Sequence, residues 1–219
     1  AKTRLEEKGF YIVQEQSLFR RWGYLAGTDE QRANELMTYF RDKSVKAIFP
    51  GTGGYGSTRI LEYLDFKIIR ENPKIFIGYS DITAYLISIT QRTKLITFNR
   101  PMLTTYKHGF EEYSYNQMIN ILSGKKKIDV LSSNKIKPHI LKQGTAVGPL
   151  WGGNLTLVIN RLGTNDQINT NNSILFLEDL DEYLYHLDRM MMNLKRNNKF
   201  LNIKGLIIGS MSNIKDNQI

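Results

Sequence analysis

The sequence predicts an α/β protein whose N-terminal part is a doubly wound parallel sheet. Short apolar runs at 45–49, 74–77 and 95–98 alternate with segments whose apolar residues have helical spacing. Glycine-rich turns follow the first two runs directly, as is typical where a strand leads into a helix. Parallel strands need crossover connections, usually helices, so this alternation favours parallel pairing. A hydrophobic fraction of 41% in 219 residues is enough for a packed core.

The N-terminal elements have recognisable boundaries. Thr28 and Gln31 form a capping box, in which each side chain pairs with a free backbone amide at the start of a helix. That helix carries Ala33, Met37 and Phe40 on one face, the spacing of a helix packed on a sheet. The expected elements are, in order, a strand at 10–13, a helix from Thr28, a strand at 45–49, a helix at 59–64, a strand at 74–77, a helix at 82–90 and a strand at 95–98.

The pattern changes after Pro101, which suggests three parts. These are an N-terminal α/β domain at 1–103, a polar connector at 104–140 and a C-terminal domain at 141–219. The connector holds one expected helix, at 115–122. The expected C-terminal elements are β structure at 144–151, a turn at 152–154, a helix at 155–162, a strand at 174–177, a helix at 185–196 and a strand at 205–208.

Composition excludes several classes of protein and site. The chain has no cysteine, which rules out disulfides, zinc–thiolate sites and thiol catalysis. Its net charge of +9 comes from scattered Lys and Arg, and the dense run at 125–127 is typical of a solvated turn, so we expect no nucleic-acid partner. No apolar stretch approaches the roughly 20 residues of a membrane span, and no signal peptide is recognisable, so we expect no membrane insertion. No histidine–carboxylate cluster has metal-ligand spacing, so we expect no metal and no cofactor.

The sharpest local motif is Gly78-Tyr79-Ser80-Asp81, between an apolar strand and a helix. Glycine relieves crowding at such a turn, and a serine there points its hydroxyl into the crevice beside the free amides of the helix start. Those amides can stabilise an oxyanion, as in a nucleophile elbow. The alternative is that Ser80 or Asp81 only caps the helix. On this local pattern alone, both interpretations stay open.

The glycine-rich loop at 51–56 also follows a strand, on the side where open α/β sheets bind ligands. Its glycines allow backbone amides to approach a substrate closely. The loop is not a P-loop, because no Lys-Ser/Thr pair follows Gly56, and its glycine offsets do not match a dinucleotide fingerprint. A plain tight loop is the alternative.

Two acids, Glu178 and Asp179, follow a buried strand in the last third of the chain. A carboxylate in that position can orient a histidine, as the third member of a catalytic triad does. The alternative is a solvated acidic turn. The chain has three histidines, His108, His139 and His186, and none has the local setting expected of a catalytic base.

Taken together, these segments resemble the LD-carboxypeptidase family of serine peptidases, which also contains the microcin C immunity peptidases. The resemblance covers about residues 9 to 210 and is an ordered series of motifs. The series is Gly23-Tyr24-Leu25-Ala26-Gly27-Thr28-Asp29, Ala47-Ile48-Phe49, Gly53-Gly54-Tyr55-Gly56, Leu64-Asp65-Phe66, Asn72-Pro73-Lys74, Ile77-Gly78-Tyr79-Ser80-Asp81-Ile82-Thr83, Thr97-Phe98, Gly152-Gly153-Asn154-Leu155, Gly163-Thr164, Ile174-Leu175-Phe176-Leu177-Glu178-Asp179 and Asp188-Arg189-Met190.

The resemblance implies a Ser-His-Glu triad. It places Ser80 on the nucleophile and Glu178 on the triad acid, with Glu182 as a second candidate for the acid. It implies that the amide of Asp81 and an amide of the Gly53-Gly54 loop form the oxyanion hole, and that Asn154 lines the site. It further implies a Rossmann-like N-terminal domain and a smaller, β-rich C-terminal domain, with the site between them.

The chain departs from the family pattern in two places. A first strand and glycine loop are missing before Gly9, and the family's catalytic histidine, in a Gly-His turn, is expected beyond Ile219. We therefore expect both domains to be incomplete, with apolar surface exposed, and we assign none of the three histidines as the base.

The implied function is a serine carboxypeptidase that releases terminal D-alanine from muropeptide tetrapeptides in peptidoglycan recycling. A microcin C-type immunity peptidase is the alternative within the family, and a non-catalytic muropeptide-binding homologue is the alternative of another class. The resemblance also implies a cytoplasmic homodimer.

Overall fold

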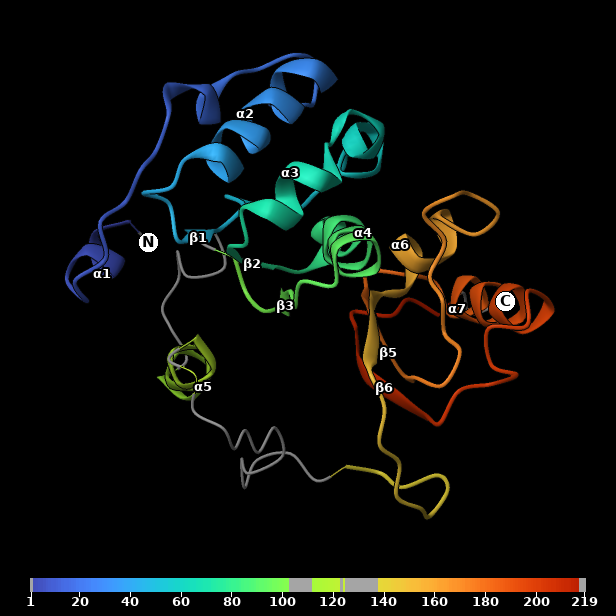
Figure 1. The fold of residues 1–219 in the computed structure, drawn as a ribbon. Coiled ribbons are helices and arrows are strands. Elements are labelled where there is room, and N and C mark those ends of the chain that lie inside the picture. Colours follow the sequence, from blue (N-terminus) through green and yellow to red (C-terminus); the bar gives the residue numbers. More distant parts are fainter. Residues whose placement is uncertain (1, 103–111, 123, 125–137, 217–219) are drawn as a thin grey trace.

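The computed structural model describes residues 2–102, 112–122, 124 and 138–216, which form an α/β fold with two three-stranded parallel sheets (Figure 1). The α/β class and the parallel pairing predicted from the sequence are confirmed. Most of the predicted connector at 104–140 lies outside the described residues. Its expected helix is present as α5 (Glu112–Leu122).

The first sheet has the strand order β1-β2-β3 and is built from three short strands. They are β1 (Ala47–Ile48), β2 (Ile75–Gly78) and β3 (Phe98–Asn99). Its helical elements are α1 (Lys2–Glu6), η1 (Gln16–Phe19), α2 (Asp29–Arg41), η2 (Thr58–Tyr63), α3 (Phe66–Glu71), η3 (Ser80–Ile82) and α4 (Thr83–Thr93). Phe40, Ile69 and Phe76 are fully buried in one cluster, so α2 and α3 pack with β2 into a common core.

The predicted capping box at the start of α2 is confirmed. The Gln31 amide donates to Thr28 Oγ1 (3.2 Å), and the Thr28 amide donates to Gln31 Oε1 (3.0 Å). Ala33, Met37 and Phe40 face the core, as their spacing predicts. The cap matters for the site, because α2 starts immediately beside the glycine-rich loop.

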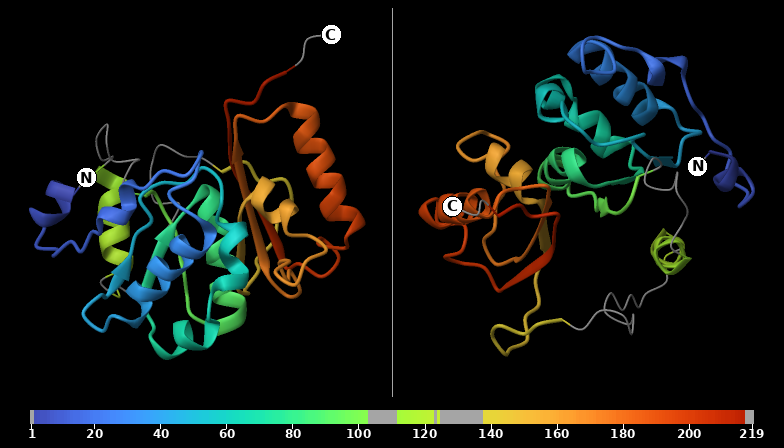
Figure 2. Two further views of the ribbon diagram at one scale, coloured as in Figure 1. Left: turned by 90° about the horizontal axis from the view of Figure 1, so that it is seen from above. Right: turned by 180° about the vertical axis from the view of Figure 1, so that it is seen from behind.

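The second sheet has the strand order β4-β5-β6. Its strands are β4 (Leu150–Asn154), β5 (Ile174–Leu180) and β6 (Gly205–Ser212). The connecting helices α6 (Leu155–Asn160) and α7 (Leu184–Arg196) lie together on one side of this sheet (Figure 2). The resemblance implied a β-rich C-terminal domain; the described part is α/β instead, because its parallel strands require crossover helices.

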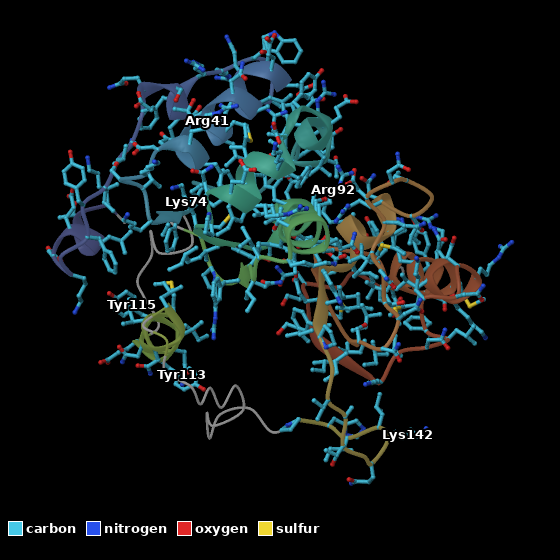
Figure 3. The ribbon with its side chains drawn as sticks, in the orientation of Figure 1. Arg41, Lys74, Arg92, Tyr113, Tyr115 and Lys142 are labelled. Atoms are coloured by element: carbon cyan, nitrogen blue, oxygen red, sulfur yellow. The ribbon has the colours of Figure 1, made fainter. Side chains whose placement is uncertain are left out.

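Helix α4 joins the two halves of the fold. Leu86 and Ile89 belong to the first core, whereas Ile87 belongs to the core of the second sheet. Near the end of α4, Arg92 stacks over the Phe66 ring, 4.5 Å from its centroid, and pairs with Asp166 Oδ1 at 2.6 Å (Figure 3). One helix therefore fixes how the strands that carry the site face each other.

Four predicted elements were wrong or misplaced. Of the β structure expected at 144–151, only Leu150 and Trp151 lie in a strand, β4. Residues 10–13 form no strand, and Tyr11 is 93% exposed, because this aromatic segment packs against no sheet. Residues 152–154 are the end of β4 rather than a turn, and Gly152 and Gly153 stay in the ladder at φ values of +130° and +133°. The segment 59–64 is a 3₁₀ helix, η2, rather than an α-helix.

Gly152 supports a stability prediction. A Cβ atom there would lie 1.8 Å from the backbone oxygen of Phe176, its neighbour on β5. We expect Gly152→Ala to lower the free energy of unfolding by more than about 3 kcal/mol, since it adds a backbone clash to an unfavourable φ. Urea unfolding measures this. Gly144→Ala is the matched control, because a Cβ atom on Gly144 would meet no atom within 4 Å; equal effects of the two substitutions would contradict the prediction.

Apolar surface is exposed at the free edge of the second sheet. Leu206, Ile207 and Ile208 of β6 are 42%, 47% and 43% exposed, as expected for a strand with one paired side. Within the described ranges, none of the helices is long and apolar enough to cross a membrane.

Candidate active site

The Ser80 turn has the geometry of a nucleophile elbow. β2 ends at Gly78, and Ser80 begins η3 with a φ of +58°, in the left-handed region that non-glycine residues rarely adopt. A Cβ atom on Gly78 would lie 2.4 Å from Ile82 Cγ2, so the glycine lets the strand turn closely into the helix. The Ser80 hydroxyl is partly exposed and makes no hydrogen bond within the described part of the chain.

The glycine-rich loop lies directly against this serine. A Cβ atom on Gly53 would be 3.2 Å from Ser80 Cβ and 3.3 Å from Ser80 Oγ, so a side chain at this position would crowd the serine. Gly54 has a φ of +106° and open space where its Cβ would be. The structure therefore brings Gly53 to Ser80, with Gly54 next to it on the solvent side. Donation of their amides to an oxyanion stays a prediction.

The Asp81 side chain ties this loop to the nucleophile turn. Asp81 is 4% exposed, and its Oδ2 accepts a hydrogen bond from the Ser57 amide (2.9 Å). On the other side, Arg32 Nη1 donates to the Gly56 oxygen (3.0 Å), and Arg32 Nη2 pairs with Asp29 (2.5 Å). The sequence predicted a place in the oxyanion hole for the Asp81 amide and, as the alternative, a helix cap by Ser80 or Asp81; no side-chain cap is formed at the start of η3 or α4. The Asp81 carboxylate has another role, which is to hold the loop over Ser80.

This contact gives a prediction for the Asp81 carboxylate. Asp81→Ala leaves the buried Ser57 amide without an acceptor and frees the loop, so we expect kcat/KM for a reaction at Ser80 to fall about 10²-fold, the loss typical of a misplaced oxyanion donor. We expect Asp81→Asn to keep most of the activity, because its amide oxygen still accepts. Asp42→Ala is the matched control, since Asp42 also accepts from a loop amide, that of Ser44 (2.8 Å), but far from the site. Steady-state kinetics measure kcat/KM for each variant. Equal kcat/KM values for Asp81→Ala and Asp42→Ala would contradict the prediction.

Glu178 lies across a cleft from the Ser80 turn. The cleft has a volume of about 260 Å³. It is lined by Tyr79, Asn99, Arg100, Pro101, Phe176, Glu178 and Ser210. Glu178 Oε1 is buried and has no hydrogen-bond partner among the described groups. Burial raises the pKa of the Glu178 carboxyl to about 7, and the charge of Asp179 adds to the rise. A carboxylate with an unpaired buried oxygen is ready to accept a hydrogen bond from a third group.

Asp179, by contrast, is fully engaged in structural hydrogen bonds. Its Oδ1 accepts from Asn154 Nδ2 (2.8 Å) and the Leu180 amide (2.9 Å), and its Oδ2 accepts from the amide and hydroxyl of Thr156 (both 2.9 Å). Successive side chains of a strand point to opposite faces. The geometry thus separates the two acids: Glu178 faces the cleft, and Asp179 supports the strands behind it.

Asn154 also has a structural position. It is 3% exposed, its Oδ1 caps α6 by accepting from the Leu157 amide (3.1 Å), and its Nδ2 donates to Asp179. Its own amide donates to Thr83 Oγ1 (3.1 Å), in the first turn of α4. Asn154 therefore links the nucleophile helix to the second sheet. Its lining of the site, expected from the family resemblance, stays a prediction.

Neither of the described histidines forms a hydrogen bond with Ser80 or Glu178. His186 Nδ1 pairs with Glu182 Oε2 (2.8 Å), and Glu182 Oε1 accepts from Thr156 (3.2 Å), so Glu182 is engaged elsewhere. His139 makes no hydrogen bond to either site residue, and His108 lies outside the described residues. The described residues contain no group of three or more His, Cys, Asp or Glu side chains that could hold a metal ion.

Sequence reasoning missed the remaining lining of the cleft. Asn99 and Arg100 follow directly on the apolar run at 95–98, so their position after a parallel strand was the available signal. Ser210 has no such signal, because β6 continues beyond the predicted strand at 205–208.

The comparisons with known proteins identify the family of the chain. Residues 1–100 match the model of the LD-carboxypeptidase N-terminal domain, and residues 147–219 match the model of its C-terminal domain. A protein of Bacillus subtilis (strain 168) described as "Probable murein peptide carboxypeptidase" is 39% identical over 215 residues, which cover 95% of this chain and 66% of the relative. A Synechocystis carboxypeptidase homologue is 32% identical, over 93% of this chain and 65% of its own. The chain thus spans just under two thirds of the length of these relatives.

Solved structures show the same fold. The muramoyltetrapeptide carboxypeptidase of Oxalobacter formigenes is 26% identical with a TM-score of 0.83, over 98% of this chain and 72% of that one. The microcin immunity protein MccF, in complex with glutamyl sulfamoyl guanosine, is 28% identical with a TM-score of 0.84, over 96% and 71%. A MccF-like protein of Bacillus anthracis is 31% identical with a TM-score of 0.83, over 96% and 71%. The chain belongs to the LD-carboxypeptidase family of serine-type peptidases.

Proposed function

We propose that this protein is a serine-type LD-carboxypeptidase that releases the terminal D-alanine from muropeptide tetrapeptides. One observation carries the proposal: Ser80 is held at a φ of +58° against Gly53, and its neighbour Tyr79 lines a cleft together with Glu178, whose buried Oε1 has no hydrogen-bond partner among the described groups. Backbone strain of this kind is retained where it serves a mechanism. The murein peptide carboxypeptidase among the relatives supports the choice of substrate.

In the proposed reaction, Ser80 Oγ attacks the carbonyl carbon of the L-centre that precedes D-alanine. The hydroxyl proton passes to a general base, and the carbonyl oxygen takes the negative charge, which backbone amides of the Asp81 turn and the Gly53 loop stabilise. The C–N bond then breaks, and the base returns the proton to the departing D-alanine nitrogen. Water hydrolyses the acyl-enzyme by the same steps and regenerates Ser80.

Glu178 is proposed to orient the base. In this family the base is implied to be a histidine, and Glu178 Oε1 is the acceptor that its second ring nitrogen requires. An imidazolium formed during the reaction lies next to the carboxylate and is stabilised by it. Neither His139 nor His186 is assigned to this role.

A second candidate is a microcin C-type immunity peptidase. The structural likeness to MccF bound to glutamyl sulfamoyl guanosine favours it. Both candidates use the same nucleophile and the same oxyanion stabilisation. They differ in the leaving group, which is D-alanine in one and the sulfamoyl nucleoside in the other.

The test is a direct comparison of substrates. The full-length gene product is incubated with a muropeptide tetrapeptide and, separately, with a glutamyl sulfamoyl nucleoside, and the products are separated by chromatography. We expect release of D-alanine from the tetrapeptide. Cleavage of the nucleoside conjugate alone would favour the immunity peptidase, and binding of the tetrapeptide without cleavage would favour a non-catalytic homologue.

A further inference from the structure

We propose that Arg100 forms a subsite for the free α-carboxylate of the substrate's terminal residue, and so determines that the protein acts as a carboxypeptidase. The inference rests on the proposed function and concerns the same cleft. It adds the group that recognises the chain end, which neither the triad nor the oxyanion hole provides.

The backbone fixes Arg100 beside the nucleophile strand. Asn99, at the end of β3, is in register with Gly78 of β2, and the Arg100 amide donates to the Gly78 oxygen (3.0 Å). Gly78 is two residues before Ser80. Arg100 is partly exposed and lines the cleft together with Tyr79 on its own side and Glu178 on the opposite side.

The charges of the cleft point to an anionic ligand at Arg100. Among the described lining residues, Arg100 is the one cation and Glu178 the one acid. Other arginines around the site are engaged: Arg32 and Arg59 both pair with Asp29, at 2.5 Å each. No ion pair within 4.0 Å is found for Arg100 in the described part of the chain. A partly desolvated guanidinium without an acid is well suited to a carboxylate, which it binds through two parallel hydrogen bonds.

The chemistry of the substrate agrees with this placement. The α-carboxylate of terminal D-alanine lies one residue beyond the scissile carbonyl, about 4 Å away along the chain. With the scissile carbon at Ser80, a carboxylate near Arg100 is attracted, whereas the same group near Glu178 is repelled. The arrangement thus orients the peptide and selects a chain end over an internal bond.

The experiment compares a tetrapeptide with a free terminal carboxylate and the same tetrapeptide with a terminal amide. Full-length wild type, Arg100→Ala and Arg100→Lys are assayed for hydrolysis of both. Arg196→Ala is the control, since Arg196 is exposed in the last turn of α7, away from the cleft. Circular dichroism verifies that each variant is folded.

We expect Arg100→Ala to lower kcat/KM for the free acid by about 10- to 150-fold, mostly through KM, the range of a hydrogen bond to a charged group. Activity on the amide should change less than threefold, and Arg100→Lys should recover part of the loss. The inference would be overturned if Arg100→Ala lowered kcat/KM equally for the free-acid and amide peptides. It would also be overturned if Arg100→Ala and Arg196→Ala had the same kcat/KM for the free-acid peptide.

Binding separates this inference from the proposed function. The affinity for both peptides is measured by calorimetry with the Ser80→Ala variant and with the Ser80→Ala, Arg100→Ala double variant. This measurement of binding needs no turnover. If the double variant binds the free-acid peptide more weakly but the amide peptide equally well, the subsite is supported. This holds even if wild type releases no D-alanine, because the lack of D-alanine release would refute only the proposed function. Binding of the acid that does not depend on Arg100, or no binding of the acid, overturns the subsite itself.

Discussion

Ser80→Ala is expected to lower kcat for D-alanine release by about 10⁴- to 10⁶-fold, because it removes the attacking oxygen while the rest of the site stays in place. Ser80 is partly exposed and its hydroxyl has no hydrogen bond to a described group, so the substitution removes no structural contact of that oxygen. Alanine also tolerates the left-handed φ about as poorly as serine does, so the turn should keep its strain. The free energy of unfolding should therefore change by less than about 1 kcal/mol.

Ser210→Ala is the matched control for this prediction. Ser210 lines the cleft beside the Ser80 turn but lies on β6, without a strand-to-helix turn of its own. D-alanine release is followed by an amino-acid oxidase assay on all three proteins. A Ser210→Ala variant as inactive as Ser80→Ala would show that the assay reports the integrity of the cleft rather than the nucleophile.

Glu178→Gln is expected to reduce kcat of the full-length gene product by about 10⁴-fold and, in the 219-residue chain, where no described group pairs with Glu178 Oε1, to stabilise the fold above neutral pH. The catalytic loss follows because a neutral amide cannot stabilise an imidazolium or hold the base in the correct tautomer. The stabilisation follows from the environment of the carboxylate: Glu178 Oε1 is buried without a partner, and burial raises the pKa from 4.5 to about 7. Few substitutions combine a loss of activity with a gain of stability, so the pair of effects marks a functional group.

The pH window of this stabilisation follows from the shift. Glu178 binds its proton more tightly in the folded state, so ionisation costs the fold stability as the pH rises from about 4.5 to about 7. Below that window Glu178 is protonated in both states and carries no penalty. The free energy of unfolding of Glu178→Gln should therefore equal that of wild type at about pH 4. At about pH 8 it should be higher by up to about 3 kcal/mol, which is an upper limit because water reaches part of the side chain.

Urea unfolding at both pH values measures this difference, and Asp179→Asn is the neighbouring control. Asp179 accepts four hydrogen bonds, so its neutralisation should lower the free energy of unfolding, opposite in sign to Glu178→Gln near about pH 8. A Glu178→Gln variant that is less stable than wild type near about pH 8 would mean that Glu178 has a structural partner.

Much of the fold could be predicted from the sequence where the signal is local. The Thr28 capping box, the apolar face of α2 and the long helix α7 all depend on residues a few positions apart, and the structure confirms them. Residues 152–154 show the opposite case. Two consecutive glycines indicate a turn locally, but pairing of β4 with β5 keeps both in a strand, and only the Phe176 backbone explains why they are glycines.

For the candidate site, too, the sequence predicted the features with a local signal and missed the contacts between distant residues. The strand-to-helix turn, which is encoded within a few residues, made Ser80 a candidate nucleophile, and the family resemblance favoured it and added Glu178 and the Gly53 loop. The sequence could not predict that Glu178 faces the cleft whereas Asp179 accepts structural hydrogen bonds. This difference depends on donors of Asn154 and Thr156, which lie more than twenty positions away. The Asp81–Ser57 contact, which spans 24 positions, was hidden for the same reason.

The most direct test of the central claim is the site of covalent labelling by a fluorophosphonate, which phosphonylates activated serines. The labelled protein is digested and the modified residue is identified by mass spectrometry, with Ser80→Ala and Ser210→Ala treated in parallel. The label is predicted on Ser80, to be absent from Ser80→Ala and to persist in Ser210→Ala. A label on another residue of wild type, together with D-alanine release that survives Ser80→Ala, would contradict the assignment of Ser80 as the nucleophile.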